Sequence, residues 1–389
     1  MPFVPRLLAP HLLRAARGFP AVVLTGPRRA GKTTLLRRLF PRAEFVALDA
    51  PDVLERLSAD PRTFMEERRP PVILDEIQNA PALFPYLKAA IDRAPRRTGQ
   101  WLITGSQEAP LMERVTESLA GRVAVLALWP FSRAESPRVD LLRGGFPEVL
   151  ARPGLKDVWF SSYVQTYLER DVREVLNVRN LGTFRRFLAL LAARHGQVLN
   201  KTDIAAPLGL SVPALGAWLH VLEVTGQVLV VPPYFENVGK RLLKTPKVYF
   251  TDSGLVCHLL GIRSQQELER SPFLGPIVEG FVAAEIAKAQ MNQGLRREVY
   301  FFRDQQGFEV DFVAPVRGET LLIEAKASRT VLPRDAYAVA ALRKRLSGRR
   351  RAVVAHRATR DRPPTGAIAP GVEAVTLESL VQQLNDEDA

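Results

Sequence analysis

Residues 26–33 have the spacing G-x4-G-K-T, which is typical of a loop that binds phosphate groups. Its glycines let the backbone curl so that N–H groups point at phosphate oxygens. Within the loop, Lys32 is expected to reach the β- and γ-phosphates, and the Thr33 hydroxyl is expected to bind Mg²⁺. The expected phosphate-binding residues are Gly26, Pro27, Arg28, Arg29, Ala30, Gly31, Lys32, Thr33 and Thr34.

Two elements must position this loop. Residues 21–25 are short, apolar and partly β-branched, which predicts a buried parallel strand. Residues 34–40 have helical spacing, and a helix N-terminus favours a bound anion. The order strand, loop, helix predicts a site for ATP and Mg²⁺, with Lys32 as a catalytic residue.

A pair of carboxylates follows the apolar run 71–74. We expect Asp75 to bind Mg²⁺, directly or through water, and Glu76 to act as the general base for the attacking water. A third run, residues 100–107, ends in small polar residues. Its position suits a γ-phosphate sensor, for which Thr104 and Ser106 are the candidates.

These motifs make the chain similar to the AAA-type P-loop ATPases of bacteria and archaea that are fused to a C-terminal domain of unknown function. The resemblance covers nearly the whole chain and rests on residues 26–33, 74–78, 104–106, 121–123, 144–148, 167–172 and 247–255. It implies assembly into a homo-oligomer, such as a hexameric ring, in which one subunit supplies an arginine to its neighbour's γ-phosphate. Arg122 and Arg114 follow the sensor strand and are the candidates for that arginine.

Composition narrows the class of protein further. The 389 residues are enough for two or three domains, and a single cysteine, Cys257, excludes an internal disulfide and a multi-cysteine metal site. No segment approaches the ~18 uncharged apolar residues of a membrane span, and no signal peptide is recognisable at the N-terminus. We therefore expect a cytoplasmic protein with no membrane partner.

The formal net charge is +13, and basic residues are dense between Arg329 and Arg362. Such a cluster is a candidate surface for the phosphates of nucleic acid. A solvated helix and loop would have the same composition, so both interpretations stay open.

Breaks in composition divide the chain into residues 1–136, a P-loop AAA-type ATPase; 137–182, a helical connector; 183–265, a winged-helix-like region; and 266–389. In the third part, residues 214–225 take the position of a recognition helix, with wing strands at 227–231 and 247–250. That helix carries no arginine or lysine, so a packing or protein-binding module is the alternative to DNA binding.

The last part has a second chemical pattern. Residues 307–313 and 321–326 predict neighbouring strands, with Asp311 on the first and Glu324 and Lys326 on one face of the second. Glu279 lies upstream in a helical run, 276–289. The order resembles the restriction-endonuclease-like PD-(D/E)xK fold.

Such a group has a plausible chemistry. Asp311 and Glu324 would hold one or two Mg²⁺ ions, Glu279 would complete the metal shell, and Lys326 would orient the nucleophile or neutralise the phosphate. Two alternatives remain: the fold serves as a DNA-binding scaffold without cleavage, or the residues are ordinary ion pairs on a sheet surface.

The expected fold is therefore α/β: a P-loop AAA-type ATPase domain, then a winged-helix region and a restriction-endonuclease-like α/β domain. The expected function is ATP hydrolysis coupled to action on DNA, duplex or branched, as in repair, recombination or defence. The rival is an ATP-gated switch that acts on a protein partner and uses the nuclease-like part as a scaffold.

Overall fold

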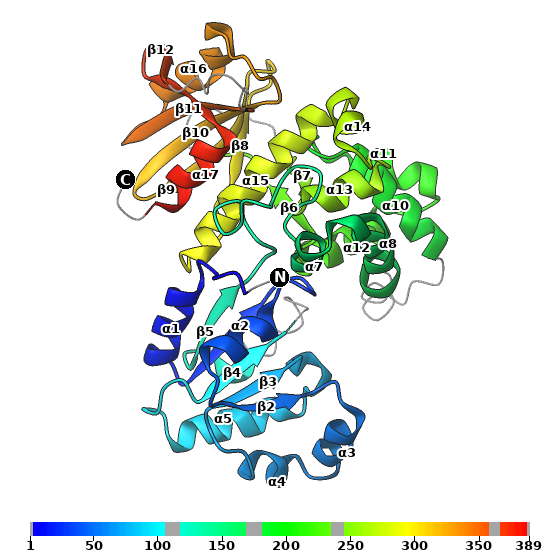
Figure 1. The fold of residues 1–389 in the computed structure, drawn as a ribbon, viewed down its shortest axis with the longest axis vertical. Helices are drawn as coiled ribbons and strands as arrows, with labels where there is room; N and C mark the ends of the chain where they lie inside the picture. The colour runs from blue at the N-terminus through cyan, green and yellow to red at the C-terminus, as the bar shows by residue number, and fades with distance from the viewer. Residues whose placement is uncertain (1–2, 106–116, 169–180, 235–244, 358–365, 387–389) are drawn as a thin grey trace. The chain divides into compact units, whose positions relative to one another are not determined.

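The computed structural model describes residues 3–105, 117–168, 181–234, 245–357 and 366–386 (Figure 1). Contacts divide the chain into two compact units. The first consists of residues 1–130 with 224–226 and 291–295, and the second contains all the others.

The first unit is built on a five-stranded sheet in which all the strand pairs are parallel. Its strand order is β2-β3-β4-β1-β5. The strands are β1 (Ala21–Thr25), β2 (Glu44–Ala47), β3 (Val72–Asp75), β4 (Trp101–Thr104) and β5 (Val123–Ala127). Because the carboxyl ends of parallel strands meet at one edge, the ends of β1, β3 and β4 lie together there.

Helices cover both faces of this sheet in three layers, and the α/β class is the one that the sequence predicts. Strand β1 is buried throughout; Ala21 and Val23 pack into one apolar cluster, and Val22 and Leu24 into another. The second cluster includes side chains of α1 (Ala9–Gly18) and α2 (Lys32–Leu39). The first includes side chains of α3 (Pro51–Ala59), α4 (Pro61–Glu66), η1 (Ile77–Asn79) and α5 (Leu83–Arg93).

The second unit begins with helices around one apolar core. They are α7 (Pro147–Ala151), η2 (Pro153–Leu155), α8 (Lys156–Tyr163), η3 (Val164–Leu168), α10 (Leu181–Ala193), α11 (Lys201–Ala205), η4 (Ala206–Leu208), α12 (Val212–Val224), α13 (Ser253–Leu259) and α14 (Gln265–Arg270). Strands β6 (Val228–Val231) and β7 (Lys247–Phe250) pair antiparallel beside them.

Most of the expected winged-helix elements lie where the sequence predicts them. Asn200 caps α11 by accepting hydrogen bonds from the N–H groups of Thr202 and Asp203. Within the helical connector expected at residues 137–182, the structure describes α7, η2, α8 and the π-helical turn η3, and residues 169–180 lie outside the described part. The assignment of residues 183–265 to a winged helix that binds DNA stays a prediction.

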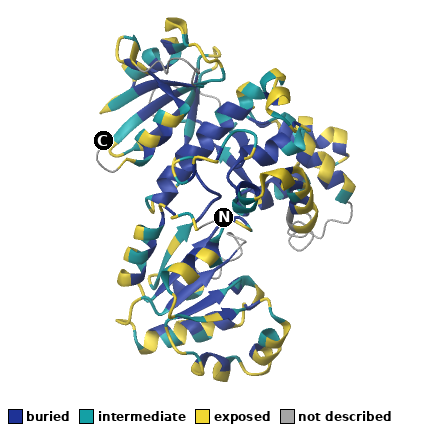
Figure 2. Cartoon of the chain, viewed as in Figure 1, coloured by how far each residue is buried: buried dark blue, intermediate teal, exposed yellow. Residues whose placement is uncertain are grey.

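The second unit ends in a six-stranded sheet of order β12-β13-β11-β10-β9-β8. Its elements are α15 (Leu274–Asn292), β8 (Tyr300–Arg303), β9 (Glu309–Val316), β10 (Glu319–Lys326), η5 (Pro333–Ala336), α16 (Tyr337–Arg345), β11 (Arg350–His356), β12 (Gly366–Ala369), β13 (Val372–Thr376) and α17 (Leu377–Asn385). The predicted hairpin of β9 and β10 is confirmed, with Phe312 opposite Ile323. Figure 2 shows the strands of this sheet largely buried where helices cover them.

Among the described residues, no single helix is both long and apolar enough to cross a membrane. Residues 201–208 and 212–224 reach the required length only when they are taken together, and a 107° bend separates them.

Candidate functional site

The phosphate-binding loop connects β1 to α2 in the first unit. Gly26 has φ 132° and lies so close to the carbonyl oxygen of Leu128 that a Cβ atom would overlap it. Gly31 has φ 100° and immediately precedes α2. The loop therefore depends on glycine at both ends, as its spacing predicts. Pro27 and Ala30 are buried, whereas Arg29 and Thr34 are exposed.

The lysine of the loop is 5% exposed, and its ammonium is held inside the loop. Lys32 Nζ donates hydrogen bonds to the carbonyl oxygens of Gly26, at 2.8 Å, and Pro27, at 2.9 Å. A buried ammonium is thus positioned within the curl of backbone that is expected to receive phosphate.

Arg6 braces the same loop from outside, a contact that the sequence does not reveal. Its guanidinium donates to the carbonyl oxygens of Ala30, at 2.9 Å, and Trp129, at 2.6 Å. Arg6 is 6% exposed, so the loop is tied to the chain after β5 through a buried charge. No local motif surrounds Arg6, and only the fold brings these carbonyls to it.

Asp75, at the end of β3, joins three elements. Its Oδ1 atom accepts hydrogen bonds from the hydroxyls of Thr33, at 2.6 Å, and Thr104, at 2.7 Å. Burial raises the pKa of Asp75, and the two hydroxyl bonds oppose that rise. Carboxylate and hydroxyl oxygens are ligands that Mg²⁺ accepts, so Asp75 and Thr33 fit the predicted metal site.

Glu76 follows in a left-handed conformation with φ 58° and ψ 51°, which is uncommon for a residue with a side chain. Its N–H donates to the Thr104 hydroxyl at 3.0 Å, and Gln78 donates a short hydrogen bond to its carboxylate. Thr104 thus holds the backbone of Glu76, and Gln78 holds its carboxylate. The sequence does not single out Gln78 as a site residue, although it lies in the 74–78 motif.

The structure describes only some of the candidates for the γ-phosphate sensor and the arginine finger. Thr104, one of the two sensor candidates, contacts Asp75, whereas Ser106 and Arg114 lie outside the described residues. Arg122 forms an exposed ion pair with Asp92 of the same chain, with 2.6 Å between Nε and Oδ1. Its assignment to a neighbouring subunit's nucleotide stays a prediction.

Glu279, Glu309, Asp311 and Glu324 gather in the second unit; we call them the acidic group. The three predicted members come together as expected from α15, β9 and β10. Glu279 receives a hydrogen bond from the Tyr249 hydroxyl, and Lys247 Nζ lies 2.8 Å from its Oε1 atom. The sequence reasoning missed Glu309, whose Oε1 atom is 2.5 Å from the same Lys247 nitrogen.

Protein donors also meet the other two carboxylates. Asp311 accepts the N–H of Ala325 at 2.8 Å, and Glu324 accepts the ammonium of Lys326 at 2.7 Å. Burial, followed by the negative charges of Glu279 and Glu324, raises the pKa of Asp311 well above its ordinary value. Burial likewise raises the pKa of Glu324. The predicted pair Glu324 and Lys326 therefore shares one face of β10.

The basic residues between Arg329 and Arg362 fall into two groups, those that pair with other side chains and those that are exposed. Arg357 and Arg329 both pair with Glu269, and Arg351 contacts Gln383. Other cations are exposed: Arg334, Lys344, Arg345 and Arg349, of which Arg345 also lies over the Phe308 ring and Arg349 has 85% of its side chain accessible. Tyr337, at the start of α16, is 73% exposed beside them in sequence. Arg360 and Arg362 lie outside the described residues.

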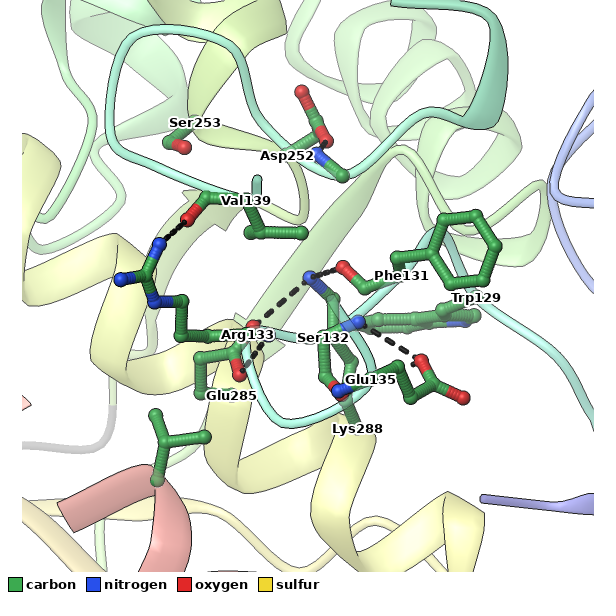
Figure 3. Close-up of polar contacts among 12 residues, drawn as sticks. Trp129, Phe131, Ser132, Arg133, Glu135, Val139, Asp252, Ser253, Glu285 and Lys288 are labelled. Carbon is green, nitrogen blue, oxygen red and sulfur yellow. Dashed lines mark hydrogen bonds and ion pairs between the residues drawn. The ribbon is translucent and has the colours of Figure 1, made fainter. Parts of the chain in front are cut away.

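A further polar cluster holds the segment after residue 130 against α15 (Figure 3). The ammonium of Lys288 contacts the Glu285 carboxylate at 3.2 Å and the carbonyl oxygen of Phe131 at 3.1 Å. The other Glu285 oxygen accepts the N–H of Arg133 at 2.9 Å. Glu285 is 1% exposed and Lys288 is 4% exposed, so this is a buried ion pair with two backbone partners.

Two of the downstream sequence landmarks meet in the same unit. The carboxylate of Asp252 accepts the N–H of Gly145 at 2.7 Å and that of Leu255 at 3.0 Å. A Cβ atom at Gly144 would overlap this carboxylate, which accounts for glycine there. Residues 144–148 and 251–255 thus form one structural joint that caps α13.

Comparisons with known proteins agree with this organisation. Family models match residues 18–136 as an AAA domain, and residues 135–266 and 274–378 as two domains of unknown function. Uncharacterized protein Rv2008c of Mycobacterium tuberculosis and uncharacterized protein Mb2031c of Mycobacterium bovis are each 36% identical to this chain over 330 residues. The match covers 83% of this chain and 74% of each relative.

Among solved structures, the Walker-type ATPase PABY2304 of Pyrococcus abyssi aligns with a TM-score of 0.43 and 17% identity. The alignment covers 65% of this chain and 94% of that one. The family itself is shown by the mycobacterial sequences and the matched domain. The chain belongs to the same family as these two mycobacterial proteins and carries a P-loop ATPase domain of the AAA class at residues 18–136.

Proposed function

We propose that this protein hydrolyses ATP in its AAA domain and couples turnover to binding of DNA by its second unit. The observation that carries the first part is the contact of the Thr33 and Thr104 hydroxyls with one oxygen of Asp75. It brings a residue of the phosphate-binding loop to the ends of two neighbouring strands, where the catalytic groups of such a domain must converge.

The residues have distinct tasks in this reaction. When bound, Mg²⁺ would neutralise charge that develops on the phosphate oxygens, and Thr33 and Asp75 would hold it. The Lys32 ammonium would leave the carbonyls of Gly26 and Pro27 for the β- and γ-phosphates. Glu76, held by Thr104 and Gln78, would accept a proton from the attacking water.

The exposed cations of the second unit support the DNA part. Arg334, Lys344, Arg345 and Arg349 project from η5, α16 and the approach to β11. Arginine and lysine bind phosphates without reading sequence, and an exposed aromatic side chain such as Tyr337 can stack on an unpaired base. We therefore propose a DNA ligand recognised mainly through its backbone, duplex or branched. Assembly into a homo-oligomeric ring, with Arg122 near a neighbour's nucleotide, belongs to the same proposal.

A salt titration of DNA affinity, run alongside an ATPase assay with added DNA, tests this proposal. Replacing Arg334, Lys344 and Arg349 together with glutamine should flatten the dependence of affinity on salt, by up to ~0.9 in slope for each phosphate that the variant no longer neutralises. The matched control replaces Arg152, Arg263 and Arg270, which are equally exposed cations of the same unit, and should leave the slope unchanged.

The proposed coupling between ATP hydrolysis and DNA binding can be tested in the same experiment. DNA should raise the ATPase rate, and ATP held unhydrolysed by Glu76→Gln should change DNA affinity, because coupling between two binding sites is reciprocal. The DNA part fails if DNA neither binds at ~50 mM salt, where electrostatic binding is strong, nor alters turnover.

A second candidate function is an ATP-gated switch that acts on a protein. It is favoured by α12, whose exposed positions include Val212 and His220 and which contains no arginine or lysine. A surface of that composition suits a protein more than a phosphate backbone. Negative results with DNA, together with retained ATPase activity, would favour this candidate.

A further inference from the structure

Lys247 is the feature that sets the acidic group apart from a metal site. It begins strand β7, is 3% exposed as a residue, and its ammonium lies 2.8 Å from Glu279 Oε1 and 2.5 Å from Glu309 Oε1. The same nitrogen lies 5.5 Å from the centre of the Phe301 ring. A buried positive charge therefore lies between carboxylates contributed by α15 and β9.

The remaining carboxylates each have at least one partner, although the Oε2 atom of Glu324 is buried without a hydrogen-bond partner among the described residues. Lys326 pairs with Glu324, the Ala325 N–H binds Asp311, and Arg303 lies 3.3 Å from the second oxygen of Glu309. Three basic side chains thus contact three of the four carboxylates, and a backbone N–H meets the fourth. In the described part of the chain, no group of three or more histidine, cysteine, aspartate or glutamate residues is arranged to hold a metal ion.

This arrangement does not fit the divalent metal that the nuclease-like pattern implies. Mg²⁺ requires several oxygens to converge at about 2.0–2.1 Å from one point. The Lys247 ammonium already takes the position where two of the carboxylates converge, and it would repel a divalent ion placed beside it. Glu279 has a further donor in the Tyr249 hydroxyl.

We infer that the Lys247 ammonium is the resident cation of the acidic group and takes the place of a metal there. It ties strand β7 to α15 and β9, so that the helical region and the C-terminal sheet are joined through a buried ion cluster. Of the alternatives that the sequence left open, the structure favours a scaffold without metal-dependent cleavage. The inference does not depend on ATP hydrolysis or DNA binding, since it concerns the resting second unit.

Manganese binding by the full-length, nucleotide-free protein tests this inference through the EPR signal of free Mn²⁺. Wild type and Asp311→Asn should bind the same number of ions, because the acidic group binds none. Lys247→Met should bind one ion more than wild type, and the double variant Lys247→Met/Asp311→Asn should not bind that additional ion. A wild-type ion that Asp311→Asn abolishes would overturn the inference.

Thermal unfolding supplies a readout that does not require metal. Lys247→Met should lower the melting temperature clearly, because Glu279 and Glu309 would lose their shared partner. Lys201→Met removes an exposed lysine of the same unit and should leave it unchanged. If Lys247→Met does not fold, the wild-type comparison with Asp311→Asn still decides. A Lys247→Met protein as stable as wild type that gains no ion would also overturn the inference.

Discussion

Two carboxylate sites in this molecule differ in the groups that contact the carboxylate oxygens. At the edge of the first sheet, one oxygen of Asp75 accepts hydrogen bonds from two hydroxyls, those of Thr33 and Thr104. In the acidic group, the ammonium of Lys247 lies between Glu279 and Glu309. Hydroxyls can turn and share a carboxylate with Mg²⁺, whereas an ammonium competes with it.

The comparison shows that residue type alone does not define a metal site. Both sites combine carboxylates with a nearby lysine, and both have a familiar spacing. In the first unit Lys32 donates hydrogen bonds to the backbone carbonyls of Gly26 and Pro27, and two hydroxyls contact the carboxylate oxygen of Asp75. In the second unit the lysine contacts the carboxylates themselves. The position of the lysine nitrogen, rather than its presence, separates a site ready for a cation from one that already has one.

The largest expected effect would separate the two sites by activity. Glu76→Gln should still bind ATP but hydrolyse it at least ~10²-fold more slowly, the scale of losing one general base. Asp311→Asn should hydrolyse ATP at the wild-type rate, because the acidic group takes no part in turnover. Steady-state phosphate release measures both. Equal rates for Glu76→Gln and wild type would remove Glu76 from the reaction.

A smaller effect, on the stability of the second unit, is expected from substitutions in α15, the helix that carries Glu279. A Cβ atom at Gly280 would overlap the ring of His195, which is 2% exposed and cannot move away into solvent. Gly280→Ala should therefore destabilise the second unit by about 1–3 kcal/mol, the usual cost of overpacking.

Gly275 is the matched control on the same helix, because a Cβ atom there has open space. Gly275→Ala should leave stability unchanged or raise it by up to ~1 kcal/mol through helix propensity. Denaturant unfolding of both variants measures the difference. Equal stabilities would mean that α15 does not pack on His195 as described.

An effect of similar size is expected on the pH dependence of stability. Burial lowers the pKa of His195 from 6.5 to about 3, and its Nδ1 atom accepts the N–H of Phe250 at 3.0 Å. Because the folded pKa lies below the unfolded one, this contribution is complete above pH 6.5 and is lost as pH falls toward 3. The loss approaches ~1.4 kcal/mol per pH unit within that window.

His195→Asn should flatten this dependence while lowering stability at neutral pH, and the exposed His220 supplies the control. His220→Asn should keep the wild-type dependence. Thermal unfolding between pH 7 and pH 5 measures all three proteins. If His195→Asn kept the full wild-type dependence on pH, another group would have to account for it.

Local patterns are sufficient to predict the nucleotide-site part of the first unit. The loop, its strand and its helix are contiguous in sequence, and Asp75 and Thr104 end neighbouring parallel strands, so the fold has only to bring three strand ends together. The hairpin that carries Asp311 and Glu324 is predictable for the same reason, because a short turn joins its strands.

Contacts between distant residues account for what the sequence does not reveal. The sequence pattern identifies Lys247 only as the start of a wing strand, and its partners Glu279 and Glu309 lie far along the chain on other elements. Arg6 likewise meets carbonyls that only the completed sheet brings to it. Side chains that act through tertiary contacts have no spacing that identifies them.

The polar cluster on α15 has a consequence for how the two halves of the chain can be separated. The AAA domain match ends at residue 136, yet the backbone of Phe131 and Arg133 supplies partners to the buried charges of Lys288 and Glu285. A C-terminal fragment starting at 137 would lack those backbone partners. The two charges would then either stay buried with fewer hydrogen bonds or become exposed to water, and both outcomes destabilise the fragment. A fragment starting before Phe131 retains these partners, so its stability would represent that of the second unit. The stability of the shorter fragment would be lowered by the missing contacts.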